Sequence, residues 1–305
     1  MAPALLWVPV TIGAALAQVL RNGAQAGLTR KIGTLGATQV RFVFGLPFAT
    51  LFLAIALFLT GERPPAPNAA AVAWCALGAL CQIAATALML VVMRDRAFSV
   101  AYAYIKTEPI LVALMGVILL GDHLSLLGWL AVGVVTFGVL LAAVRPGHWR
   151  DLLDETGMIG AGLAAGGLFG LSAIAFRGAI GALPESAGGA DFVIRSLEML
   201  VLSLAIQSAV LGVWLALRDR AAFTGSLREW RGSIGAGLAG AVASAGWFTA
   251  FALTPAANVR TLALVEMPIA ALLAGKLTGK VPQRQELAGM AVVMVGLALL
   301  FASVA

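Results

Sequence analysis

Four charged side chains interrupt two long apolar runs of the sequence. Lys106 and Glu108 lie in SVAYAYIKTEPILVALMGVILL, and Arg260 and Glu266 lie in ANVRTLALVEMPIAALLAG. Charges inside membrane-spanning helices are rare, and they mark substrate or ion pathways. Lys106 and Arg260 can bind a carboxylate, whereas Glu108 and Glu266 can bind an amino group or a coupling proton. The four residues therefore predict a site for a small zwitterion or anion.

A structural role for the same charges stays open. In that interpretation, Lys106 pairs with Glu108 and Arg260 pairs with Glu266, or the cations reach toward the membrane surface. On a regular helix, however, residues two apart point about 200° apart. Lys106 and Glu108 could then not pair with each other and would need other partners.

Further polar and aromatic side chains are candidates to line the same site. Tyr102 is four residues from Lys106 and so shares its helix face. Tyr104 shares a face with Glu108. The set of expected substrate-binding residues is Lys106, Arg260, Tyr102, Tyr104, Trp247, Gln18 and Gln82. Packing between helices is the alternative role for Trp247 and the two glutamines.

Four other residues are candidates for gating. Pro109 and Pro268 follow the two glutamates, and a proline removes one backbone hydrogen bond and bends a helix. Arg195 and Glu198 are three residues apart and can pair on one helix face. These features predict that the prolines and the Arg195–Glu198 pair take part in the movement between transport states. The alternatives are a static helix bend at the prolines and an anchoring role for the charged pair.

The composition of the chain indicates what kind of helices position these residues. The chain has 305 residues, of which 61% are hydrophobic and 11% charged, with a mean hydropathy of +0.99. Soluble domains are about a quarter charged, so the composition predicts a protein that is almost wholly embedded in a lipid bilayer. The formal charge of +6 is concentrated in short loops and predicts no nucleic-acid partner.

Ten membrane spans are expected, because about 20 apolar residues cross a bilayer. They cover residues 3–27, 33–60, 69–93, 97–119, 124–144, 156–180, 190–217, 231–253, 256–278 and 285–304. Loops after odd-numbered spans hold most lysines and arginines, which places those loops in the cytoplasm and both termini outside.

The two halves of the chain resemble each other. Residues 121–138, GDHLSLLGWLAVGVVTFG, and 279–296, GKVPQRQELAGMAVVMVG, begin and end with glycine at an offset of 158, which also places Glu108 on Glu266. Two repeats are therefore expected, at residues 1–150 and 151–305. With five spans each, they enter the membrane in opposite directions and enclose a central cavity. The predicted fold is thus all-α, with ten transmembrane helices in two inverted five-helix repeats.

The Glu-Pro segments and the turns that follow them resemble the drug/metabolite transporter superfamily, in its type with two EamA-like halves. Thr107-Glu108-Pro109 leads to the corner Leu120-Gly121-Asp122, and Val265-Glu266-Met267-Pro268 leads to Gly279-Lys280. Lys280 departs from the acidic residue frequent at that point. The resemblance implies a ten-helix bundle around a cavity and the transport of small metabolites, with many bacterial members acting as exporters. Some members have cytoplasmic termini, which differs from the orientation that the loop charges favour.

The most favoured function is a secondary transporter, an exporter of an amino acid or related zwitterion or anion, with proton coupling left open. A multidrug or cationic-compound exporter and a lipid-type flippase are the alternatives. The sequence has no metalloprotease, nucleotide-binding or serine-hydrolase motif, so it predicts neither an enzyme nor a cofactor or metal site. The expected partners are the bilayer, a small molecule and protons. The expected location is a bacterial cytoplasmic membrane, and the oligomeric state stays open.

Overall fold

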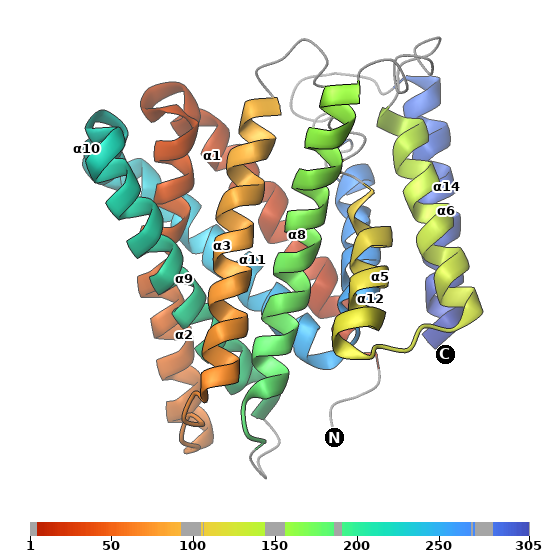
Figure 1. Ribbon diagram of the computed structural model, residues 1–305, viewed down its shortest axis with the longest axis horizontal. Helices are drawn as coiled ribbons and strands as arrows, with labels where there is room; N and C mark the ends of the chain where they lie inside the picture. Colours follow the sequence, from red (N-terminus) through yellow and green to blue (C-terminus); the bar gives the residue numbers. More distant parts are fainter. Residues whose placement is uncertain are drawn as a thin grey trace. The chain divides into compact units, whose positions relative to one another are not determined.

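The computed structural model describes residues 5–92, 105, 107–143, 156–185, 191–269, 271 and 283–304. Throughout these residues the regular structure is helical, with no strand (Figure 1). The elements are α1 (Trp7–Val43), α2 (Gly45–Thr60), α3 (Ala69–Val92), α5 (Glu108–Leu120), α6 (Leu126–Ala143), α8 (Thr156–Ala182), α9 (Asp191–Arg218), α10 (Arg220–Arg228), α11 (Trp230–Leu253), α12 (Ala256–Leu262), the 3₁₀ helix η1 (Ala263–Val265) and α14 (Arg284–Val304).

Helix α1 is two helices that meet at a sharp bend. Gly33 at the bend has φ 73° and ψ 171°, a conformation that is open to glycine and strained for other residues. The bend falls at the expected boundary between the first two spans, so a single glycine replaces the loop. The helical path then continues past Phe44 into α2, with the Phe44 N–H bonded to the Val40 carbonyl at 3.0 Å.

Replacing Gly33 by alanine should lower the free energy of unfolding by about 1–3 kcal/mol, because alanine would be held in a glycine-only region. The matched control is Gly27→Ala in the same helix. A Cβ on Gly27 meets no atom within 4 Å, and alanine favours the helix, so this variant should be as stable as wild type or slightly more. Thermal unfolding of the purified protein in detergent measures both, and equal stability of the two variants would contradict the expected strain.

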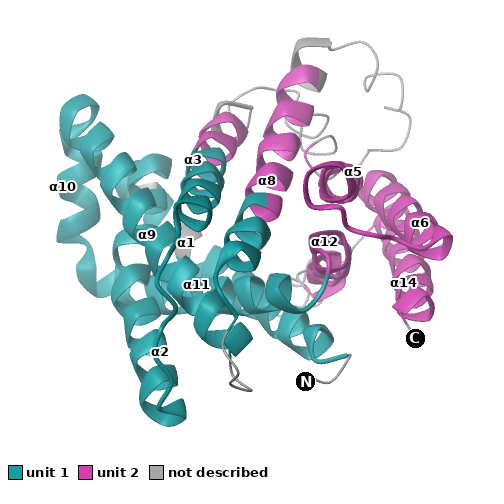
Figure 2. Cartoon of the chain, turned by 60° about the horizontal axis from the view of Figure 1, so that its bottom comes forward, with its two compact units in different colours: residues 1–83, 175–254 teal, residues 84–174, 255–305 magenta. Residues whose placement is uncertain are grey.

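The helices form two compact units, each built from both halves of the sequence (Figure 2). Unit 1 comprises residues 1–83 and 175–254, and unit 2 comprises residues 84–174 and 255–305. Helices α3 and α8 each run from one unit into the other.

Within unit 2, α6 and α14 pack so closely that their backbones touch. A Cβ on Gly138 would lie 2.7 Å from the Val293 nitrogen, and a Cβ on Gly296 would lie 2.8 Å from the Val135 nitrogen. Small residues permit this approach between helices in a membrane.

The corner after α5 also lies in unit 2. Gly121 ends α5 with φ 66°, and the Asp122 N–H bonds back to the Gly116 carbonyl at 3.1 Å. This is a glycine-terminated helix end, at the corner on which the resemblance to the transporter superfamily partly rests.

Within unit 1, α1 packs on α11 and α2 packs on α9. Glycines again lie at the contacts. A Cβ on Gly246 would lie 2.7 Å from the Ala14 Cβ, and a Cβ on Gly237 would lie 2.6 Å from the Phe44 Cβ.

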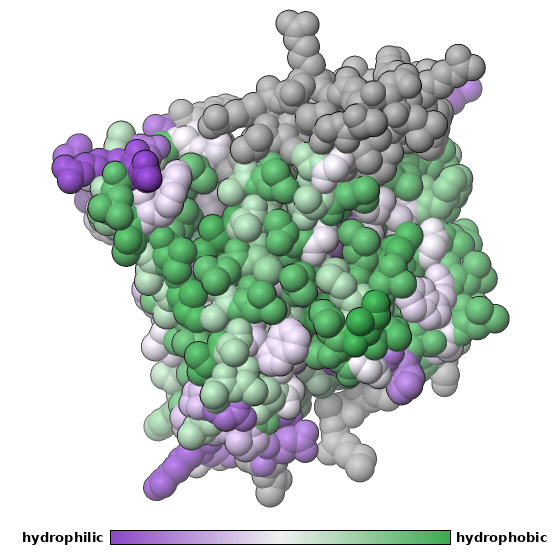
Figure 3. All heavy atoms as spheres, in the orientation of Figure 1, coloured by the Kyte–Doolittle hydropathy of each residue, from purple (hydrophilic) through white to green (hydrophobic). Residues whose placement is uncertain are grey.

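Large apolar side chains cover the outward faces of many helices. Phe58, Ile118, Leu126 and Leu217 are between 74% and 87% exposed, and hydrophobic residues dominate the face shown in Figure 3. Extensive apolar exposure of this kind is rare in soluble monomers. Seven helical stretches are long and apolar enough to cross a membrane, and together these observations describe a multi-pass membrane protein.

The ten expected spans are only partly confirmed. The seven candidate spans are Lys31–Thr60, Ala69–Met89, Leu126–Ala143, Gly160–Ala182, Asp191–Arg218, Trp230–Leu253 and Arg284–Val304. The described residues of the expected spans at 3–27, 97–119 and 256–278 are mostly helical. The first carries polar residues such as Gln18 and Arg21, whereas in the other two the described helices are short and parts of the spans lie outside the described residues.

Candidate functional site

An ion pair between α5 and α12 joins two of the four charged residues in unit 2. The Arg260 Nε donates to the Glu108 Oε1 at 2.6 Å, and the Arg260 Nη2 contacts the same oxygen. The side chains are 21% and 13% exposed, so the pair is largely shielded. These two helices lie in the spans that the repeat predicts to be equivalent, and each was expected to carry buried charges. Arg260 therefore binds the glutamate of the other half, a partner that the sequence did not indicate.

The two Glu-Pro segments interrupt regular helix in different ways. Glu108 and Pro109 occupy the first positions of α5, with Thr107 as the preceding cap. Proline is favoured at a helix start because its missing N–H would be unpaired there. Glu266 follows the short 3₁₀ helix η1, and Pro268 lies in the helical residues after it.

Pro109 thus lies in the first turn of α5, whereas Pro268 follows a tightened 3₁₀ turn. A 3₁₀ stretch within a helical run often marks a hinge, and gating by these prolines stays a hypothesis. Lys106, Tyr102 and Tyr104, which were expected beside this ion pair, lie outside the described residues.

Expected substrate-binding side chains form two of the polar contacts between helices in unit 1. The Trp247 Nε1 donates to the Gln18 Oε1 at 3.1 Å, which joins α11 to α1. The Gln207 Nε2 donates to the Gln82 Oε1 at 2.6 Å, which joins α9 to α3. Three of the expected substrate-binding side chains therefore take part in these contacts between helices. Trp247 is 6% exposed and Gln207 is 1% exposed.

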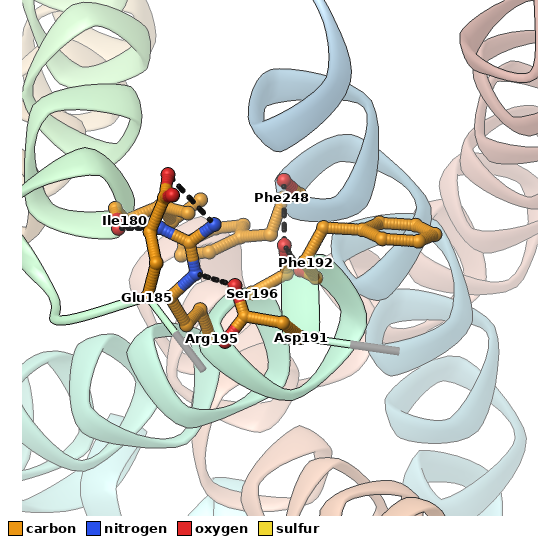
Figure 4. Close-up of polar contacts among 7 residues, drawn as sticks. All are labelled: Ile180, Glu185, Asp191, Phe192, Arg195, Ser196 and Phe248. Carbon is orange, nitrogen blue, oxygen red and sulfur yellow. Dashed lines mark hydrogen bonds and ion pairs between the residues drawn. The ribbon is translucent and has the colours of Figure 1, made fainter. Parts of the chain in front are cut away.

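The expected ion pair between Arg195 and Glu198 does not form. Figure 4 shows the Arg195 guanidinium held by Asp191, by Glu185 and by the Ile180 carbonyl. The Arg195 Nε lies 2.6 Å from the Asp191 Oδ2, and its Nη2 lies 3.7 Å from the Glu185 Oε1. Asp191 precedes Arg195 by one helical turn, the orientation that favours such pairs, and its charge stabilises the N-terminus of α9.

These contacts fasten the start of α9 to the end of α8. Among the described residues, the buried Glu198 Oε2 accepts no hydrogen bond. Arg195 therefore pairs with residues other than Glu198, which places a carboxylate within a candidate membrane span, and gating by these residues stays a prediction.

The Arg177 side chain donates hydrogen bonds to backbone carbonyls far away in the sequence. Its Nη1 donates to the carbonyls of Phe251 and Thr254 at 2.9 and 2.8 Å, at the C-terminal end of α11. A cation at that position satisfies terminal carbonyls and complements the helix dipole. Arg177 thus closes the end of α11. Only a partner from a distant part of the chain defines this role, so no local signal could identify it.

Among the residues that the structure describes, no group of three histidine, cysteine, aspartate or glutamate side chains is arranged to hold a metal ion. Cys75 and Cys81 are both buried free thiols.

The exposed apolar helices describe a helical membrane protein that holds a shielded ion pair. The sequence model of the EamA-like transporter family matches residues 5–144. This match bears out the resemblance to the drug/metabolite transporter superfamily over residues 5–144. The seven candidate spans make the protein a multi-pass membrane protein, and its N-terminal half is similar to membrane transporters.

The fold extends over the rest of the chain. A solved structure titled "Crystal structure of protein" has a TM-score of 0.70 and 14% sequence identity, and the match covers 96% of this chain and 95% of that chain. At that identity the likeness shows the fold alone. No curated protein matches the sequence.

Proposed function

We propose that the protein is a secondary transporter that exports a small zwitterionic or anionic metabolite, such as an amino acid, by alternating access. The observation that carries this proposal is the shielded Glu108–Arg260 ion pair within a transporter fold. A carboxylate and a guanidinium held together inside a membrane protein can exchange partners with the ammonium and carboxylate groups of a zwitterion. Lys106, Tyr102 and Tyr104 precede this pair in the chain and belong to the proposed site.

Two inverted repeats, at residues 1–150 and 151–305, are part of the proposal. The contacts of α6 with α14 support them. Gly138 packs against Val293, and Gly296 packs against Val135. At the offset of 158 these two contacts exchange with each other, as a two-fold relation between repeats requires. The contacts of α5 with α12 and of α2 with α9 also join corresponding spans.

Proton coupling is proposed at Glu108 or Glu266. A carboxylate that releases its cation can take up a proton, so that substrate and proton compete for one site. The proposed location is a bacterial cytoplasmic membrane, with the basic loops in the cytoplasm.

The test is reconstitution into liposomes that contain a trapped pH dye, with a panel of amino acids, organic anions and organic cations. Substrate-dependent proton movement by the wild type, absent in Glu108→Gln, is the expected result. Glu229→Gln is the matched control, because Glu229 pairs with Lys31 at an exposed surface where such pairs contribute little. Transport of organic cations alone would favour the multidrug alternative and contradict the proposal. Loss of coupling in Glu198→Gln but not in Glu108→Gln would move the coupling site to α9.

A further inference from the structure

Helix α10 lies between the ends of two candidate membrane spans of unit 1. Only Asp219 separates it from the span Asp191–Arg218, and only Glu229 separates it from the span Trp230–Leu253. In Figure 1, α10 lies at the C-terminal end of α9. A span that crosses the hydrocarbon core of a bilayer ends at the membrane surface. Helix α10 therefore lies where one leaflet presents its lipid headgroups.

One face of α10 packs on the protein. A Cβ on Gly225 would lie 3.1 Å from the Ile32 Cγ2, and a Cβ on Gly36 would lie 3.3 Å from the Ala222 carbonyl oxygen. Ala222 and Ser226, one helical turn apart, are 8% and 1% exposed. Helix α1 thus covers this face, and the remaining faces of α10 are directed toward the surroundings of the protein.

The uncovered side of α10 and the adjacent helix ends combine exposed arginines with exposed apolar side chains. A hydrophilic patch lies over α10 in Figure 3, beside hydrophobic residues. Helices that lie in the membrane surface have this combination, and tryptophan is enriched at that depth. We define the α10 surface as the exposed residues Arg218, Arg220, Arg228, Arg231, Leu217, Leu227 and Trp230.

The two acidic residues of this segment have structural partners. The Asp219 side chain caps α10 by accepting from the Ala222 N–H at 3.0 Å. Glu229 pairs with the Lys31 Nζ at 3.2 Å. Residues 218–231 contain four arginines, against these two acids, so the segment keeps a net positive charge at the end of the two spans.

Neutral groups of the protein orient two of the arginines. The Arg231 guanidinium lies 5.3 Å from the centre of the Trp230 ring, a cation–π contact. The Arg220 Nε donates to the Ala216 carbonyl at 3.3 Å. A guanidinium has five N–H donors and binds phosphate oxygens through paired hydrogen bonds. These contacts therefore hold both cations at the surface in a form that suits a phosphate group.

We propose that the α10 surface binds the headgroups of anionic phospholipids, such as phosphatidylglycerol, in the leaflet where α9 ends and α11 begins. The arginines contact the phosphate groups. Leu217 and Leu227 continue the apolar surface of the spans and contact the upper part of the acyl chains. This lipid site goes beyond the proposed transport function and does not rest on it.

Lipid binding is measured on the full chain in nanodiscs of phosphatidylcholine with increasing amounts of phosphatidylglycerol. Native mass spectrometry counts the lipids that stay bound, and thermal unfolding gives the melting temperature. We expect the wild type to retain phosphatidylglycerol in preference to phosphatidylcholine and to melt at a higher temperature as its share rises. Each basic residue near an anionic surface contributes about fivefold, so Arg220→Gln/Arg228→Gln should lower the preference about 25-fold.

Two further variants control for charge and for position. Arg63→Gln removes an exposed arginine that follows the far end of the candidate span Lys31–Thr60, and it should keep the wild-type preference. Arg220→Lys/Arg228→Lys keeps both charges and should keep part of the preference, because only the paired hydrogen bonds are lost. All these side chains are exposed, where substitutions affect stability little.

Glycerol phosphate, added to nanodiscs of phosphatidylcholine alone, tests whether the ligand is a lipid. It should not raise the melting temperature, because it has no acyl chains to contact the apolar residues. Stabilisation by glycerol phosphate equal to that by phosphatidylglycerol would overturn the proposal in favour of a soluble phosphate compound. Equal retention of phosphatidylglycerol by the wild type and the glutamine double variant would overturn it as well, and the arginines would then only set the orientation of the spans.

Discussion

Replacement of Glu108 by glutamine should abolish transport and lower stability together. The Arg260 guanidinium loses the carboxylate that it binds at 2.6 Å, and removing one member of a buried ion pair costs about 3–5 kcal/mol. A loss of transport in this single variant therefore has two possible causes, the loss of a substrate-binding or coupling group and the loss of native packing.

Changing both members of the pair separates the causes. In Glu108→Gln/Arg260→Gln no charge is left over, so most of the stability should return, since replacing a whole buried pair is often neutral. If the pair binds substrate or protons, transport stays absent although the protein is as stable as the wild type.

The measurement is a double-mutant cycle on both thermal stability and liposome transport. A pair that only holds α5 to α12 would show transport recovering in proportion to stability, and this result would contradict the functional role. The charge exchange Glu108→Arg/Arg260→Glu extends the test, because it preserves a pair but inverts its orientation. Transport by that variant at the wild-type rate would also argue for a structural role.

The ion pair shows how far residue types alone define this site. Charge inside an apolar run identified Glu108 and Arg260 as unusual from the sequence, because such positions are costly whatever surrounds them. Their pairing with each other depends on which helices pack together. Arg260 also had Glu266 on its own chain segment, six residues away, as a plausible partner. The contact of α5 with α12 brings Glu108 to Arg260, and no local pattern encodes that contact.

Arg195 shows the same limit at a shorter range. Glu198 and Asp191 are both within one helical turn of Arg195, and the expectation favoured Glu198. The start of α9 at Asp191 reverses that preference, because the first turn of a helix stabilises a carboxylate and Glu185 lies close by. The exact start of a helix is the least certain feature of a sequence-based prediction, and here it determines the ion pair.

Helix α10 was expected as part of a loop. Its nine residues mix polar and apolar types, so hydropathy gives no membrane-span signal for it. Asp219 caps its first turn by accepting from the Ala222 N–H at 3.0 Å. An aspartate three residues before a free N–H is a helix-start pattern. Asp219 is therefore the sequence signal from which α10 could have been predicted.

The matching glycines Gly138 and Gly296, in contrast, were visible in the sequence at the offset of 158. They lead to a specific prediction about helix packing. Alanine at Gly138 should lower the free energy of unfolding by about 1–3 kcal/mol, the usual cost of overpacking. The added Cβ would lie 2.7 Å from the Val293 nitrogen, and backbone atoms cannot turn away as a side chain can. Alanine at Gly296 should cost a similar amount, because its Cβ would meet the Val135 nitrogen and Cγ2 in the same way.

Gly133→Ala is the matched control, since it lies on the same helix as Gly138 and a Cβ there meets nothing within 4 Å. The gain in helix propensity is common to all three substitutions, so the difference in melting temperature reports packing alone. Unequal effects at Gly138 and Gly296 would contradict the two-fold relation between the repeats. Small effects at both, matching Gly133→Ala, would contradict the close contact of α6 with α14. Equal and large losses would support the two-fold relation, because each half supplies the glycine against which the valine of the other half packs.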